Sequence, residues 1–183
     1  SRVMIGGFLA VGSPHGIIGK LVELGTGNLT VIANDTGFPD KGIGRLIVNR
    51  QVSEVIASHI GTNPPTGQQM HAGELEVQLI PQGTLAEQIR AAGSGLGGVL
   101  TPTGLGTVAQ EGNEVITIDG KEYILAKPIF ADVAIIKAHK ADRHGNLVYR
   151  RSARNFNPLQ AMAAKLVLAE VEEIVETGEI DPD

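Results

Sequence analysis

The fold is decided by the stretch Leu75-Glu76-Val77-Gln78-Leu79-Ile80-Pro81-Gln82-Gly83-Thr84-Leu85, in which an apolar strand leads into a helix that runs to Ala92. Thr84 and Glu87 have the T-x-x-E spacing of a capping box, which predicts that the helix begins right after Gly83. The amide of Gln82 is then expected at the carboxyl end of a strand, beside a helix N-terminus, where α/β sheets commonly bind ligands. A neutral hydrogen-bond donor there suits an oxyanion that develops during a reaction.

No obvious nucleophile accompanies this amide in the sequence. The chain has no Cys, no G-x-S-x-G elbow, no recognisable triad and no P-loop. The sequence therefore predicts half of an active site around Gln82.

Composition favours a single α/β domain. The 183 residues are 42% apolar and only 3% aromatic, so the core must consist of aliphatic side chains, which favours buried parallel strands. The expected fold is one three-layer-type domain over residues 1–183, with a mainly parallel sheet and an antiparallel hairpin excursion. Both termini are expected to be trimmed relative to the full protein.

Charge and residue usage restrict partners and location. A formal charge of −5 argues against nucleic acid, because a phosphate backbone requires a basic face. No apolar run reaches the roughly 18 residues of a membrane span, and no signal-peptide pattern precedes the first strand. The lack of cysteine fits a reducing compartment. We expect a cytoplasmic protein with no membrane and no nucleic-acid partner.

The expected elements alternate along the chain. The helix after the first strand is expected to have Ser13 as its cap and Pro14 at its first position. Asp119-Gly120 marks the turn of a hairpin within 115–129. Strands are predicted at 3–5, 29–33, 54–58, 75–80, 132–138 and 147–149, helices at 14–24, 85–92 and 159 to about 165, and a loop or short helix at 63–73.

The stretch from Gly6 to Pro14 joins a strand to a helix through a glycine-rich loop. Such a loop lets a ligand approach the backbone, and the helix N-terminus favours an anion. Close packing of a crowded turn is the alternative reason for the glycines. Asn34-Asp35 also ends a strand, where turn formers and site residues look alike.

Three other patterns are weaker. Gly93-Ser94-Gly95-Leu96-Gly97-Gly98 has the letters of a dinucleotide fingerprint, but it follows a helix instead of a strand, so we interpret it as a helix end and loop. His139-x-x-Asp142-x-His144 has metal-ligand spacing but lies among lysines and arginines, so a polar turn is expected and no metal site. Glu74 is a weak candidate for a catalytic carboxylate.

Taken together, several motifs resemble the α subunit of the family I coenzyme A transferases. They are Val3-Met4-Ile5-Gly6-Gly7-Phe8-x-x-x-Gly12-x-Pro14, Gly73 to Val77, Pro81 to Leu85, Thr101-Pro102-Thr103-Gly104-x-Gly106-Thr107 and Ser152 to Asn157. They follow the family order over essentially the whole chain. Acetate (or butyrate):acetoacetate transferases are the nearest in pattern, with 3-oxoacid and 3-oxoadipate relatives next.

The resemblance implies a mechanism and a partner. In this family a glutamate of the β subunit attacks an acyl-CoA, and the reaction is ping-pong; the assembly is expected to be α2β2. Gln82 corresponds to the oxyanion-hole glutamine and Asn34 to an active-site asparagine, while Asp35 stands where some relatives have a second asparagine. The segment assigned to coenzyme A binding is Gly6, Gly7, Phe8, Leu9, Ala10, Val11 and Gly12. Coenzyme A is expected as substrate, with no tightly bound cofactor.

Two other classes stay open at this point. A sugar-phosphate isomerase or ligand-binding regulator of related fold would need its acid, base and phosphate-binding residues in this one chain. A structural scaffold would need none of them.

Overall fold

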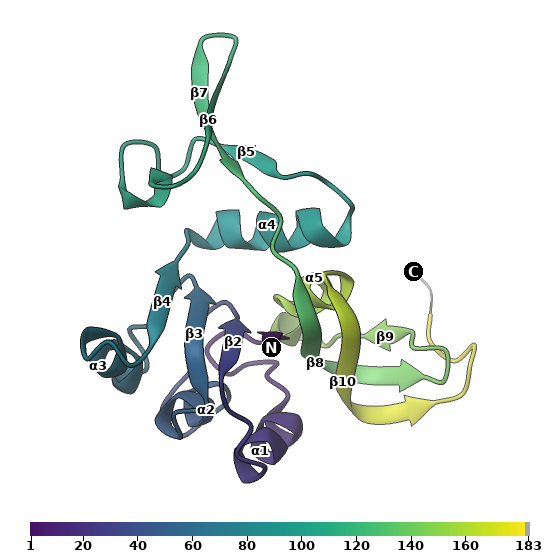
Figure 1. The fold of residues 1–183 in the computed structure, drawn as a ribbon. Helices are drawn as coiled ribbons and strands as arrows, with labels where there is room; N and C mark the ends of the chain where they lie inside the picture. The colour runs from purple at the N-terminus through teal and green to yellow at the C-terminus, as the bar shows by residue number, and fades with distance from the viewer. Residues whose placement is uncertain (182–183) are drawn as a thin grey trace.

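The computed structural model of the chain describes residues 1–181 and is built around a seven-stranded sheet. The strand order is β10-β8-β1-β2-β3-β4, with β9 added to β8 (Figure 1). Neighbouring strands run parallel except β8 and β9. The strands are β1 (Arg2–Ile5), β2 (Leu29–Ile32), β3 (Val52–Ala57), β4 (Glu76–Leu79), β8 (Ala131–Asp142), β9 (Leu147–Val148) and β10 (Ala164–Val175). The expected mainly parallel sheet is confirmed.

Helices cover both faces of the sheet and enclose two aliphatic cores. One core joins Ile18 of α1 (His15–Glu23) and Leu46 of α2 (Gly44–Val48) to the sheet, and α3 (Pro64–His71) packs beside α2. The other core joins Leu85 of α4 (Gln82–Gly93) and the residues around α5 (Asn157–Met162) to the opposite face. This is the expected three-layer arrangement. Within residues 1–181, none of the helices is both long and apolar enough to cross a bilayer.

A second, small sheet stands apart from the first. It has the order β5 (Val99–Thr101), β7 (Lys121–Ala126), β6 (Val115–Ile118), and a short 3-10 helix, η1 (Val108–Gln110), lies between β5 and β6. Figure 1 shows it beyond α4, on the side away from the main sheet. The β6–β7 turn has positive φ at Asp119 and Gly120, as its sequence predicts. The hairpin excursion is confirmed.

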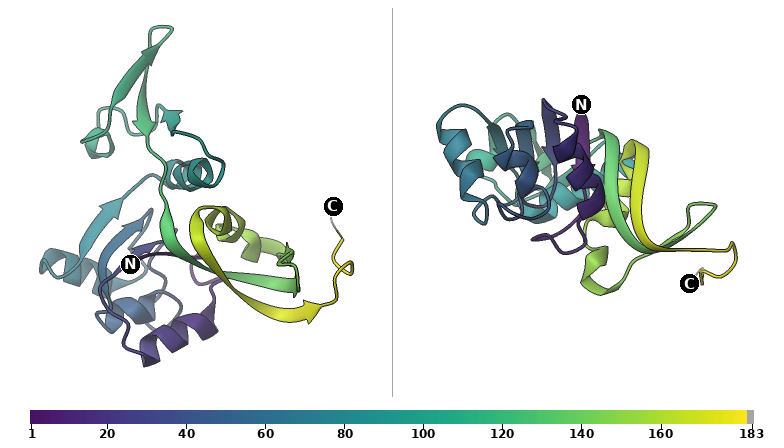
Figure 2. Two further views of the ribbon diagram at one scale, coloured as in Figure 1. Left: turned by 45° about the vertical axis from the view of Figure 1, so that its right-hand side comes forward. Right: turned by 90° about the horizontal axis from the view of Figure 1, so that it is seen from below.

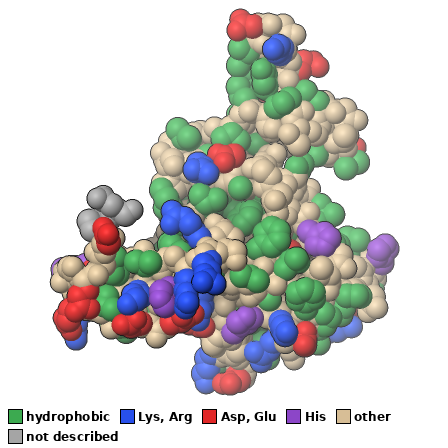
Figure 3. Space-filling view, turned by 180° about the vertical axis from the view of Figure 1, so that it is seen from behind, with side chains coloured by type: hydrophobic (Ala, Val, Ile, Leu, Met, Phe, Trp, Pro, Cys, Tyr) green, Lys and Arg blue, Asp and Glu red, His purple; other side chains and the backbone are tan. Residues whose placement is uncertain are grey.

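β8 and β10 continue side by side past the body of the sheet, and with β9 they form an arm (Figure 2). Charged side chains gather along this arm (Figure 3). Opposite charges pair across the two strands, as in Lys140 with Glu173 at 2.9 Å. Because these side chains are partly exposed, the pair contributes little to stability.

Several local predictions are wrong. The α4 helix begins at Gln82 after the extended Pro81, so Thr84 lies inside the first turn, and its hydroxyl has no partner within residues 1–181. Glu87 pairs with Arg90 instead of closing a capping box. Ser13 makes no side-chain cap for α1.

The last third of the chain also departs from the prediction. The α5 helix ends at Met162 where a helix to about Lys165 was expected, and the unassigned segment after it is the long strand β10. Earlier in the chain, the segment 44–48, for which no helix was predicted, is the helix α2.

Candidate functional site

The sequence-predicted residues come together at the carboxyl edge of the sheet. The Gly6–Gly12 loop follows β1, Asn34 and Asp35 follow β2, and Gln82 opens the helix after β4. The chain proceeds from β1 through β4 in one direction and then returns to place β8 on the other side of β1. The carboxyl end of β1 is therefore a topological switch point, the usual ligand-binding place in such sheets.

A chain of side-chain hydrogen bonds links two of these segments. The Gln82 amide donates from Nε2 to Oδ1 of Asn34 at 2.6 Å, and Asn34 donates from Nδ2 to Oδ2 of Asp35 at 2.7 Å. Asn34 and Asp35 are buried, whereas Gln82 is exposed. An amide nitrogen carries two hydrogens, so Gln82 retains one N–H for a ligand while Asn34 holds the other.

Ser58 completes the surroundings of Asn34. Its one hydroxyl hydrogen is shared between the backbone oxygen of Asn34 at 2.7 Å and Oδ1 of Asn34 at 3.1 Å. A serine nucleophile needs a base to accept its proton. The Ser58 hydroxyl faces amide oxygens instead, so the site holds an amide donor but no activated hydroxyl.

The glycine-rich loop ends in a tight turn that Asp35 holds. Phe8 and Val11 exchange backbone hydrogen bonds of 3.0 and 2.9 Å across Leu9 and Ala10, whose φ angles are +47° and +68°. Two successive positive φ angles usually require Asn or Gly, so Leu and Ala are strained here by about 1–3 kcal/mol each. The Leu9 N–H donates to Asp35 Oδ2 at 2.9 Å, which fastens the strained turn to the end of β2.

The three glycines of the loop are explained by packing. A Cβ on Gly6 would lie 1.8 Å from Oδ1 of Asn157, one on Gly7 would lie 2.2 Å from Oγ of Ser13, and one on Gly12 would lie 2.7 Å from the carbonyl of Ala153. Gly7 and Gly12 also have positive φ. The close-packing alternative therefore accounts for these glycines. The part of the loop that a ligand can reach is its tip, where the side chains of Phe8 and Val11 are exposed.

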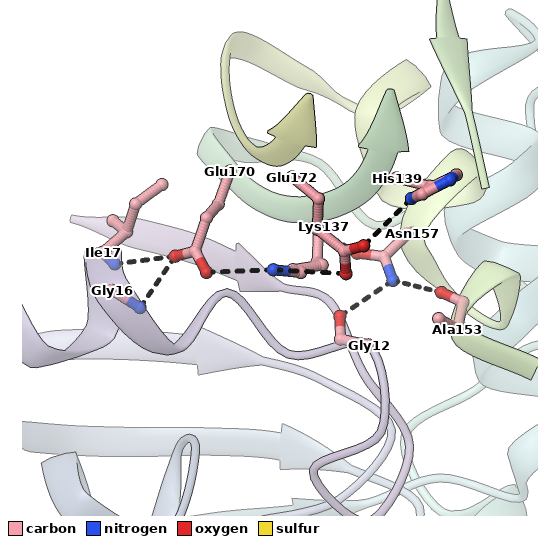
Figure 4. Close-up of polar contacts among 9 residues, drawn as sticks. All are labelled: Gly12, Gly16, Ile17, Lys137, His139, Ala153, Asn157, Glu170 and Glu172. Carbon is pink, nitrogen blue, oxygen red and sulfur yellow. Dashed lines mark hydrogen bonds and ion pairs between the residues drawn. The ribbon is translucent and has the colours of Figure 1, made fainter. Parts of the chain in front are cut away.

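Asn157 and Glu170 fix the far end of the loop (Figure 4). Asn157 donates to the carbonyls of Gly12 and Ala153 and accepts from the Lys137 N–H. The Glu170 carboxylate accepts from the N–H groups of Gly16 and Ile17 at 2.7 and 3.0 Å. The N-terminus of α1 is thus occupied by a side chain of β10, which explains why Ser13 is not needed as a cap.

The weaker candidates lie elsewhere. Glu74 pairs with Arg50 at the opposite edge of the sheet, before β4 begins. His139 contacts Glu172, and Asp142 accepts from the backbone N–H groups of His144 and Asn146 in the β8–β9 turn. No group of metal-ligating side chains occurs among residues 1–181. The Gly93–Gly98 segment ends α4 and leads into β5, as expected.

Sequence reasoning left Asp35 without a role and missed Ser58, Asn157 and Glu170. Of these four residues, only Asp35 was indicated by the sequence, through its position beside Asn34 at the end of a strand. The other three act through contacts between distant segments, such as the 145 positions that separate Asn157 from Gly12.

Comparison with known proteins settles the family. The family model described as coenzyme A transferase matches residues 1–183. The chain belongs to this family. Among coenzyme A transferases, the chain is 58% identical to the acetate CoA-transferase subunit alpha of Escherichia coli (strain K12), over 99% of this chain and 82% of that protein. It is 53% identical to the acetoacetyl-CoA:acetate/butyrate CoA transferase alpha subunit of Clostridium acetobutylicum, over 99% and 83%.

A solved coenzyme A transferase has the same fold. The apoenzyme of the acyl-CoA transferase YdiF from Escherichia coli O157:H7 superposes with a TM-score of 0.86 over the whole of this chain, at 22% identity. This chain spans 41% of the YdiF chain. At that identity the likeness shows the fold alone, and the chemistry must be argued from the site.

Proposed function

We propose that the chain is the α subunit of a short-chain coenzyme A transferase, and that it supplies the oxyanion donor to a site whose nucleophile belongs to a β subunit. The observation that carries the proposal is the exposed amide of Gln82, which Asn34 holds at the sheet edge with one N–H left over. The names of the relatives, which are alpha subunits of acetate and acetoacetate transferases, support the same division.

In the proposed reaction a β-subunit glutamate attacks the acyl-CoA carbonyl, and the thiolate of coenzyme A leaves to give an acyl-glutamyl anhydride. The thiolate then attacks the glutamyl carbonyl, which releases the first carboxylate and leaves a glutamyl-CoA thioester. An acceptor carboxylate reverses these steps, so the kinetics are ping-pong. The free N–H of Gln82 stabilises the oxyanion of each tetrahedral intermediate.

The exposed tip of the Gly6–Gly12 loop is assigned to coenzyme A contact in this proposal. Anhydride and thioester intermediates hydrolyse in water, so covering the exposed Gln82 with a second subunit protects them. We propose an α2β2 assembly located in the cytoplasm, with coenzyme A bound as substrate. Acetate, butyrate and acetoacetate are the proposed acids, and succinyl-CoA:3-oxoacid or 3-oxoadipate transfer is the alternative within the family.

The test compares the chain alone with the chain co-purified with its β subunit. Transfer from acetoacetyl-CoA to acetate is measured at several concentrations of both substrates. In a second experiment the complex is incubated with acyl-CoA, quenched and digested for mass spectrometry. We expect turnover only in the complex, parallel double-reciprocal lines, and the glutamyl-CoA adduct on β. Turnover by the chain alone, or an adduct on this chain, would overturn the proposal.

A further inference from the structure

The carboxylate of Asp35 is a buried acceptor for three donors, two from its own segment 34–37 and one from the Gly6–Gly12 loop. It is 4% exposed. Oδ2 accepts from the Leu9 N–H at 2.9 Å and from Asn34 Nδ2 at 2.7 Å, and Oδ1 accepts from the Gly37 N–H at 2.8 Å. An ionised carboxylate has only acceptor oxygens, so each of these three hydrogen bonds requires a donor on the partner.

This contact fixes which end of the Asn34 amide faces Gln82. Because Nδ2 of Asn34 points to Asp35, its Oδ1 is turned towards Gln82 and Ser58 and accepts from both, at 2.6 and 3.1 Å. Gln82 must then present its Nε2 end to Asn34. The direction of the remaining Gln82 N–H is thus set by a carboxylate that does not touch Gln82.

The same carboxylate holds the Gly6–Gly12 loop in place. Leu9 and Ala10 have positive φ without being glycine, and such a turn persists only where the surroundings impose it. The Leu9 N–H bond to Asp35 is one such restraint. The loop and the oxyanion donor are therefore both connected to this one carboxylate.

We propose that Asp35 is a positioning residue for the transferase reaction, acting through Asn34 on Gln82 and through Leu9 on the loop. The inference rests on the proposed function, since it assigns Asp35 its role relative to the Gln82 amide. It accounts for a buried negative charge that the reaction itself does not use.

A double-mutant cycle in the assembled complex tests this role. Asp35→Ala is expected to lower kcat by about 10- to 100-fold, the usual effect of a misplaced catalytic group. In the Gln82→Ala background the same substitution is expected to change kcat by less than about threefold, because the oxyanion donor that it positions is gone. Its effect through the Leu9 N–H on the loop is expected in the KM for acyl-CoA, which is measured separately. Asp35→Asn can still present an oxygen to Leu9 and Asn34, so we expect it to recover most of the loss.

Asp40 is an exposed acidic residue of the same β2–α2 segment as Asp35, and Asp40→Asn is the control that should leave kcat unchanged. If Asp35→Ala does not assemble with β, the cycle is run with Asp35→Asn, whose smaller effect should also vanish beside Gln82→Ala. Additive losses in the cycle, or an unchanged kcat for Asp35→Ala, would overturn the positioning role while leaving the proposed function intact. A Gln82→Ala complex with full kcat would instead remove the oxyanion role on which both rest.

Discussion

Gln82 and Asn34, 48 positions apart in the sequence, are joined by a 2.6 Å hydrogen bond from Nε2 to Oδ1 at the carboxyl edge of the sheet. The bond joins the start of α4 to the end of β2 across β3. It gives a flexible, exposed glutamine side chain one defined position. Preorganisation of this kind is what makes an amide an effective oxyanion donor.

Changing Asn34 to aspartate tests the polarity of this network. Asn34→Asp places a second carboxyl group beside Asp35, and two carboxylates that close cannot both be ionised without a large cost. We expect kcat to fall, and the ratio of variant to parent kcat to rise as pH is lowered from about 8 to about 5, because a shared proton restores a donor between the two groups. Asn34→Ala, which has no proton to gain, serves as the control. A ratio independent of pH would contradict the assigned hydrogen-bond directions.

The packing of Gly6 against Asn157 predicts a loss of stability in Gly6→Ala. The added Cβ would lie 1.8 Å from Asn157 Oδ1, and Asn157 is fully buried and bonded to three backbone groups. Overpacking of this kind costs about 1–3 kcal/mol or more. In Gly83→Ala, in the first turn of α4, the added Cβ would have no atom within 4 Å beyond its chain neighbours and its own helix backbone, and the variant should gain about 0.5–1 kcal/mol. Urea denaturation measures the free energy of unfolding of both variants, and equal values for the two would refute the packing explanation.

The occupation of the α1 N-terminus by Glu170 predicts a second stability effect. Glu170→Gln removes the charge that faces the N–H groups of Gly16 and Ile17, and we expect a loss of about 1 kcal/mol. Glu173→Gln is the matched control on the same strand, because its half-exposed pair with Lys140 should cost less than about 0.5 kcal/mol. Thermal denaturation of the two variants should therefore rank Glu170→Gln as the less stable, and the reverse order would exclude the helix-capping role.

Asp142 makes stability depend on pH. Hydrogen bonds from the Asn146 side chain and from the backbone N–H groups of Asn146 and His144 hold the pKa of this carboxyl below its usual value. A lowered folded-state pKa stabilises the protein above the unfolded pKa of about 3.9, and this contribution is lost as pH falls through the folded value. The gap in unfolding free energy between the parent and Asp142→Asn should therefore shrink below about pH 4. A gap that stays constant between about pH 6 and pH 3 would disprove it.

The sequence predicted the parts of the fold that depend on local patterns. Strands such as Val52–Ala57 and the Asp119-Gly120 hairpin follow from runs of aliphatic residues and from turn chemistry. Gln82 does lie at the predicted strand-to-helix junction, although the capping box used to place that junction does not form.

The predictions that failed concern features that depend on contacts between distant segments. The strand β10 has exposed Leu166, Val167 and Leu168 in a row instead of alternation, and it is a strand because β8 pairs with it along its length. Ser13 is not a cap because Glu170, far away in the chain, already occupies the helix end. The role of Asp35 could not be predicted from its neighbours in the sequence, because its bond to Leu9, 26 positions away, and the bond of Asn34 to Gln82 form only in the folded sheet edge.

The kcat of Gln82→Ala in the complex with β tests the central claim most directly. The matched control is Gln78→Ala, an exposed glutamine on β4. If Gln82 donates to the oxyanion, its removal should lower kcat by about 10²–10³ with assembly unchanged, while Gln78→Ala keeps the parent rate. A Gln82→Ala complex that assembles and turns over at the parent rate would contradict the account.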